Sequence, residues 1–133
     1  MVRADGESVT GPGTLADALD RERRLLGELA AVLRRQREGV ATEDVQAVDD
    51  SVFAAYRVMR TIEEARRRRR AVIGLLAGVA DTPIRELEAA LGPRMTPAVA
   101  AARDGLELTA RSVAREIAIN REVLRQAIET RGR

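Results

Sequence analysis

The feature that most constrains this chain is a long run of apolar residues spaced three or four apart, with no proline between residues 13 and 82. A spacing of this kind places side chains on one face of an α-helix. The run predicts one helix over about 43–79, roughly 55 Å long at 1.5 Å per residue. A helix of that length favours a coiled-coil-like bundle. The run comprises Val45, Val48, Val52, Ala55, Met59 and Ile62, passes through Arg66 and Arg69, and resumes at Ile73 and Leu76.

Two other segments show the same spacing. The first, over about 14–38, starts at Thr14 as a capping-box-like motif, is interrupted by Glu22, and is expected to end at Gly39. The second follows Thr96-Pro97, a helix start, and extends over about 97–131. The apolar residues of the first are Leu15, Leu19, Leu26, Leu29 and Leu33, and those of the second include Val99, Ala102, Leu106, Ala110, Val113, Ile117, Leu124 and Ile128.

The connections between these segments predict their arrangement. Thr42-Glu43-Asp44 can cap the second long helix, and Asp81-Thr82-Pro83 starts a short helix over about 83–91 that Gly92-Pro93 closes. Short connections make neighbouring long helices antiparallel. The predicted fold is all-α: an elongated antiparallel up-down-up bundle of three long helices with coiled-coil-like packing, and one short helix between the second and third. That short helix is expected to cover the carboxyl end of the second long helix.

The first residues differ in composition from the remainder of the chain. Residues 1–13 carry Gly6, Gly11, Pro12 and Gly13 with few apolar side chains, which predicts a disordered leader. Residues 14–131 are then expected to form one helical-bundle domain. The longest apolar run, residues 71–80, is far shorter than the ~18 residues of a membrane span, and no hydrophobic signal segment precedes the bundle. The sequence therefore predicts a cytoplasmic protein.

Several kinds of reactive side chain are missing from the sequence. The chain has no Cys and no His, and all 23 basic residues are Arg. It therefore has no thiol, imidazole or lysine for nucleophilic or acid–base catalysis and no usual zinc or haem ligand set. Its paired carboxylates, such as Asp49-Asp50 and Glu63-Glu64, lack the spacing of a calcium loop. We expect a protein that is not an enzyme and that holds neither a cofactor nor a metal.

The charge of the chain is nearly balanced. The pI of about 10.2 reflects the absence of Lys and His, because the formal net charge is only +2. Arg66–Arg70 form a run of five arginines that sweeps around a helix, so at least one must point toward a partner helix. One interpretation is a contact with nucleic acid or an acidic protein. The favoured one is a solvated segment whose arginines pair with acids such as Glu63, Glu64 and Glu107.

The end of the last helix carries more apolar residues than one narrow stripe needs. Val113, Ile117, Val123, Leu124, Ala127 and Ile128 surround Asn120. A wide stripe at the open end of a bundle is a candidate groove for a partner helix. A polar residue on such a stripe more often fixes register than contacts a ligand, and Asn120 is open to both interpretations.

Three segments, taken in order, resemble the FlgN-type flagellar export chaperones over roughly residues 14–130. They are Ile62–Arg67 (IEEARR), Val72–Leu76 (VIGLL) and Ala118–Leu124 (AINREVL). The resemblance implies a chaperone that binds the disordered carboxyl-terminal segments of hook-associated proteins of the FlgK and FlgL type and delivers them to the export gate. It implies a client site on the last helix, formed by Ile117, Asn120, Val123, Leu124, Ala127 and Ile128, with Arg121 and Arg125 at its rim.

Two other classes of function remain open from the sequence. One is a structural or regulatory bundle that forms a homodimer through the same apolar stripe. The other is a nucleic-acid-binding protein that depends on Arg66–Arg70, which the sequence disfavours because stacking aromatics and a broad basic face are missing.

Overall fold

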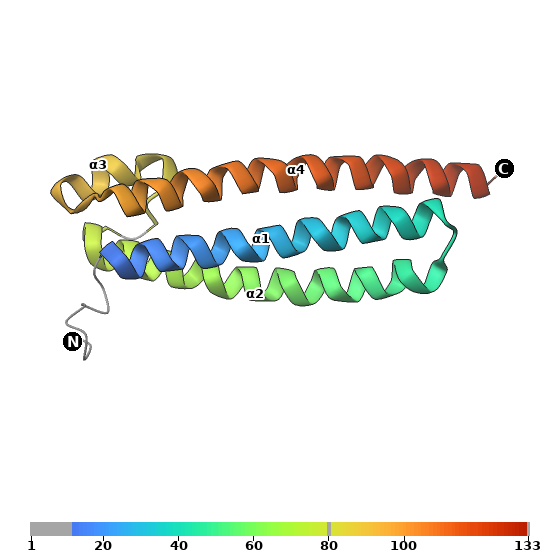
Figure 1. Ribbon diagram of the computed structural model, residues 1–133, viewed down its shortest axis with the longest axis horizontal. Coiled ribbons are helices and arrows are strands. Elements are labelled where there is room, and N and C mark those ends of the chain that lie inside the picture. The colour runs from blue at the N-terminus through green and yellow to red at the C-terminus, as the bar shows by residue number, and fades with distance from the viewer. Residues whose placement is uncertain (1–11, 80, 133) are drawn as a thin grey trace.

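The computed structural model describes residues 12–79 and 81–132, which are almost entirely helical and contain no strand. This confirms the all-α class. Figure 1 shows three long helices lying side by side as a rod, with the chain reversing direction from each one to the next. The long helices are α1 (Pro12–Ala41), α2 (Val45–Ala77) and α4 (Pro97–Arg131); between the last two lie a 3-10 turn (Ile84–Glu86), α3 (Leu87–Leu91) and a second 3-10 turn (Gly92–Arg94).

The central helix of the rod is α1. It packs along both α2 and α4, whereas α2 and α4 hardly meet. The leucines of α1 accordingly form the middle of the core, and Leu15 and Leu19 are fully buried. Each outer helix buries a face that it turns toward α1, and α2 also contacts α3.

The first helix is longer at both ends than the sequence pattern predicts. It begins at Pro12, inside the segment assigned to a disordered leader, because proline has the backbone angle of a first helical residue and needs no amide partner there. The predicted disorder of residues 1–11 lies outside the described residues. The helix also continues past Gly39 to Ala41, so the prediction that Gly39 ends it was wrong.

Gly39 allows α1 and α2 to approach each other closely. It is buried, and a Cβ atom added to it would lie 3.1 Å from Cγ2 of Val48 and 3.3 Å from Cβ of Ala47. The missing side chain therefore makes room for the first turns of α2.

The second helix begins and ends inside its predicted limits. Its N-cap is Asp44, whose side chain accepts a hydrogen bond of 3.0 Å from the amide of Ala47. Thr42, the predicted capping hydroxyl, instead donates to the carbonyl of Glu38 at the end of α1. The helix ends at Ala77 because Gly78 takes the left-handed conformation, with φ of 75°.

The stripe predicted to be buried along the first half of α2 is covered only in part: Ile62 is buried and Ala55 packs against the core, but the prediction was wrong for Val45, Val52 and Met59. Val45 is 59% exposed and Met59 is 49% exposed. The side chains that face α1 here include Ile62 and Ala55 of the stripe, together with Ser51 and Val58 on one side of it. Because α4 stays away from α2, no helix of the described residues covers the exposed members of the predicted stripe. Of the side chains facing α1, Ser51 and Ile62 are buried, and Ala55 and Val58 are partly buried.

The segment around α3 packs against the carboxyl end of α2, as the sequence predicts. Leu87 is fully buried and Leu91 nearly so, and Ile84 packs beside them. Pro83 lies just before the first 3-10 turn rather than within a helix. The last helix is capped by Thr96, whose hydroxyl accepts a hydrogen bond of 3.2 Å from the amide of Val99.

Candidate functional site

A cleft of about 430 Å³ lies at the end of the rod where α1 connects to α2. One wall is the last three turns of α4. The other is the α1–α2 connection with the first turn of α2, and most of the lining is apolar. The cleft is lined by Gly39, Val40, Glu43, Asp44, Val45, Val48, Val123, Leu124, Gln126, Ala127, Ile128, Thr130 and Arg131.

Four of the residues predicted for a partner site line this cleft. Val123, Leu124 and Ala127 are half-buried, and Ile128 is 71% exposed. They remain accessible because α1 ends at Ala41, so the last turns of α4 have little of α1 to pack against.

The opposite wall comes from residues that the sequence analysis did not assign to a site. Val40, Val45 and Val48 supply its apolar surface, and Glu43 and Asp44 supply its charge. They lie about eighty residues from the α4 wall in sequence, so no local pattern could pair them with it. The two walls lie close together because the chain reverses direction twice and so places the α1–α2 connection beside the end of α4.

The predicted rim arginines lie outside the cleft. Arg121 and Arg125 are exposed and are not among its lining residues. Arg125 forms ion pairs of 2.5 Å with both Glu122 and Glu129 on its own helix, and its guanidinium lowers the pKa of the Glu122 carboxyl. The basic residue that lines the cleft is Arg131.

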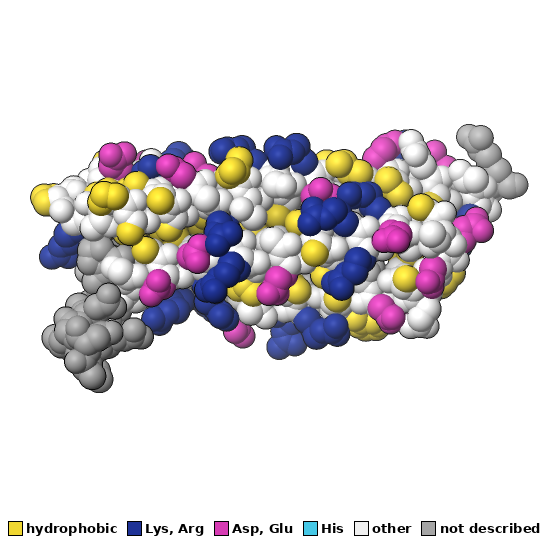
Figure 2. All heavy atoms as spheres, in the orientation of Figure 1, with side chains coloured by type: hydrophobic (Ala, Val, Ile, Leu, Met, Phe, Trp, Pro, Cys, Tyr) yellow, Lys and Arg dark blue, Asp and Glu magenta, His cyan; other side chains and the backbone are white. Residues whose placement is uncertain are grey.

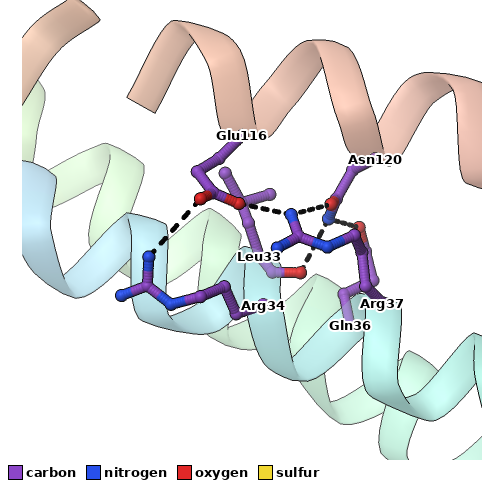
Figure 3. A network of polar contacts seen from close by, with 6 residues as sticks. All are labelled: Leu33, Arg34, Gln36, Arg37, Glu116 and Asn120. Carbon is purple, nitrogen blue, oxygen red and sulfur yellow. Dashed lines mark hydrogen bonds and ion pairs between the residues drawn. The ribbon is translucent and has the colours of Figure 1, made fainter. Parts of the chain in front are cut away.

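Asn120 is buried between α4 and α1, away from the open part of the cleft. Its side-chain amide donates to the carbonyl of Leu33 at 2.8 Å and to Oε1 of Gln36 at 2.9 Å. Its Oδ1 accepts from Arg37 at 2.9 Å. Figure 3 shows these bonds joining the two helices. The Asn120 side chain thus bonds to one backbone carbonyl and two side chains of α1, an arrangement that holds α4 in register on α1.

The network continues one turn back along α4 at Glu116. Its carboxylate accepts a hydrogen bond from Arg37 and lies 3.5 Å from the guanidinium of Arg34. The hydrogen bond from Arg37 lowers the pKa of the Glu116 carboxyl, against the opposing effect of burial. Ile117, the remaining predicted site residue, packs partly buried against the core. No buried side-chain nitrogen or oxygen of the described residues lacks a hydrogen-bond partner.

The arginine run is tied to α1 through one buried residue. Glu22, whose side chain is 4% exposed, accepts a hydrogen bond of 2.7 Å from Nε of Arg69, and Arg66 lies 4.0 Å away. The prediction that one arginine points toward a partner helix is confirmed, with Glu22 as the acceptor rather than Glu107. Arg67, Arg68 and Arg70 are exposed at different angles around α2, so they do not form one basic face.

The described residues contain neither a cluster of metal ligands nor a membrane-spanning helix. Residues 12–79 and 81–132 contain no group of three or more acidic side chains arranged to hold a metal ion. In the same residues, no helix is both long enough and apolar enough to span a bilayer.

The comparison with protein families gives one match. No curated protein and no solved structure matches the chain. The model of the family described as FlgN protein matches residues 13–133, which include the whole cleft and the three long helices except Pro12. This chain therefore belongs to the FlgN family.

Proposed function

We propose that this protein is a flagellar export chaperone that acts in the cytoplasm by binding and without catalysis. Its clients are the disordered carboxyl-terminal segments of hook-associated proteins of the FlgK and FlgL type. It keeps these segments from assembling early and delivers them to the type III export gate. Family membership supports the class of function, and the apolar cleft at the end of α4 is the observation that carries the proposed mode of binding.

The binding step is the folding of a client segment into the cleft as an amphipathic helix. Leu124 and Ala127 line the cleft from α4, and Val40 and Val48 line it from the other wall, so an inserted apolar side chain meets apolar surface on both walls. Burial of that surface drives association. The entropy lost when a disordered segment becomes ordered offsets part of the gain, which leaves an affinity low enough for release at export.

Two of the predicted residues act indirectly in this proposal. Asn120 and Ile117 hold α4 against α1 and so position the α4 wall of the cleft. The client contacts are assigned to Val123, Leu124, Ala127 and Ile128. Arg121 and Arg125 stay at the outer rim, where Arg125 is engaged by two glutamates of its own helix.

A substitution in the α4 wall tests this proposal. Leu124→Asp places a carboxylate on the apolar surface of the cleft, and we expect at least a tenfold loss of affinity for a hook-associated tail in calorimetry. The matched control is Leu108→Asp, which changes a 60% exposed leucine of the same helix that does not line the cleft. Circular dichroism checks that both variants keep their helicity. Unchanged tail binding by a folded Leu124→Asp variant would exclude this cleft as the client site.

A further inference from the structure

The first half of α2 exposes an apolar stripe that no part of the described chain covers. Val45, Val52, Tyr56 and Met59 are spaced seven, four and three residues apart, so they lie on one face of the helix over about 21 Å. Phe53 lies beside them. The two aromatic residues of the chain, Phe53 and Tyr56, are 65% and 64% exposed. Contiguous exposed apolar residues of this kind mark interaction surfaces, and aromatic side chains carry much of the energy of such surfaces. We call this set the α2 stripe.

The α2 stripe continues the candidate cleft. Val45 belongs to both, and Val48, in the first turn of α2, also lines the cleft. Tyr56 and Met59 extend the same wall away from the end of the rod by three to four helical turns. Figure 2 shows hydrophobic side chains at the surface over this part of α2, with acidic and basic side chains close to them. The combined surface is long enough for a partner helix of about four turns.

The charge beside this surface is mainly acidic. Residues 40–65 contain six acidic residues and two arginines, Arg57 and Arg60, which lie at the Tyr56 and Met59 end of the stripe. At the cleft end, the charged residues of residues 40–56 are all acidic, and Arg131 is the basic residue of the opposite wall. Glu43 and Asp44 line the cleft, and Asp49 and Asp50 are exposed next to the α2 stripe. A second copy of this chain docked cleft end against cleft end would place these acids against one another, which like-charge repulsion opposes. A partner is favoured whose apolar face carries positive charge along the edge that lies beside Asp49 and Asp50.

We propose that the α2 stripe and the cleft form one continuous docking surface for an amphipathic helix that carries basic residues along one edge. Its apolar face contacts Tyr56 and Met59 at one end and enters the cleft at the other. Its basic edge lies beside Asp49 and Asp50. This inference rests on the proposed function, because it names the chemistry that a client segment needs in order to bind the same site.

The test uses the full-length protein and two synthetic peptides of eighteen residues. Both peptides carry the same leucine face at helical spacing; one has lysines along an edge and the other has glutamates there. We expect the lysine peptide to bind at least tenfold more tightly in calorimetry at low salt, with a preference that shrinks as salt is raised. Equal affinities, or no binding of the lysine peptide, would overturn the proposal.

Substitutions locate the binding on α2. We expect Tyr56→Asp to weaken binding of the lysine peptide at least tenfold, and Asp49→Lys to reduce or reverse the preference between peptides. The control is Leu75→Asp, at a 65% exposed leucine of the same helix outside the stripe, and it should leave binding unchanged. If the affinity for the lysine peptide is the same in wild type, Tyr56→Asp and Asp49→Lys, the proposal is contradicted. Light scattering that shows a wild-type dimer which Tyr56→Asp dissociates also contradicts it.

A parallel titration with hook-associated tails separates this inference from the proposed function. Tails that bind wild type and Tyr56→Asp equally well would refute the α2 stripe and leave the chaperone function standing. Tails that do not bind at all, beside a lysine peptide that binds through Tyr56 and Asp49, would refute the choice of client and leave the docking surface standing.

Discussion

Glu22 is a charged residue on an otherwise apolar stripe, and the structure gives it a partner. Its carboxylate is buried against the guanidinium of Arg69, whose side chain is 12% exposed. Removing two charges from water is costly, and a buried pair recovers that cost only while both partners are present. The arginine run thus contains one residue with a structural role among neighbours that face solvent.

Substitutions of this pair should not be additive. We expect Arg69→Met to lower the free energy of unfolding by about 3 kcal/mol, because it leaves Glu22 buried without its main partner. The double variant Glu22→Leu/Arg69→Met should be within about 1 kcal/mol of wild type or more stable. Urea denaturation measures both, with the exposed Arg68→Ala as a control that should change stability by less than about 0.5 kcal/mol. Additive losses in the double variant would contradict the buried-pair interpretation.

At the scale of the helices, two glycines of α1 have opposite surroundings. Gly27 lies in the middle of the helix, and a Cβ added there would meet nothing within 4 Å. Gly39 is also helical, but a Cβ there would press on Val48 and Ala47 of α2. No neighbour requires the glycine at position 27, whereas the glycine at position 39 is required for the close packing of α1 and α2.

Alanine substitutions distinguish these two positions. Gly27→Ala should raise the free energy of unfolding by about 0.5–1 kcal/mol, because alanine loses less conformational entropy in a helix. Gly39→Ala should be less stable than Gly27→Ala by at least about 1 kcal/mol, because the crowding against α2 offsets the same gain. Thermal or urea unfolding of the two single variants checks this order. Equal gains at both sites would show that α2 gives way easily at Gly39.

At the scale of the whole molecule, α2 and α4 are each held by α1 and hardly by each other. The attachment of α4 near the cleft depends on the network around Asn120 and Glu116. Because the folded state lowers the pKa of Glu116, the stabilisation from this carboxylate is complete above its unfolded value of about 4.3 and is lost as pH falls through the lowered value.

Acid titration of stability tests this attachment. The difference in free energy of unfolding between wild type and Glu116→Gln should shrink as pH falls from about 5 toward 3. Arg37→Gln removes the main cause of the pKa shift, so it should give the same pH profile, and the double variant should add little to either. A difference that stays constant with pH would mean that Glu116 contributes by packing rather than by charge.

The helical class, most helix ends and the absence of reactive side chains follow from the chain alone, because they depend on local spacing, proline and glycine positions and composition. The α4 half of the site could also be predicted, since an unusually wide apolar stripe is visible in one helix. Three things required the tertiary structure: the acidic and apolar wall from the α1–α2 connection, the burial of Asn120 and Glu22, and the exposure of the α2 stripe. Helical periodicity shows that two stripes of α2 are apolar enough to be buried. Only the placement of α4 beside α1, away from α2, decides which of them is covered and which remains free for a partner.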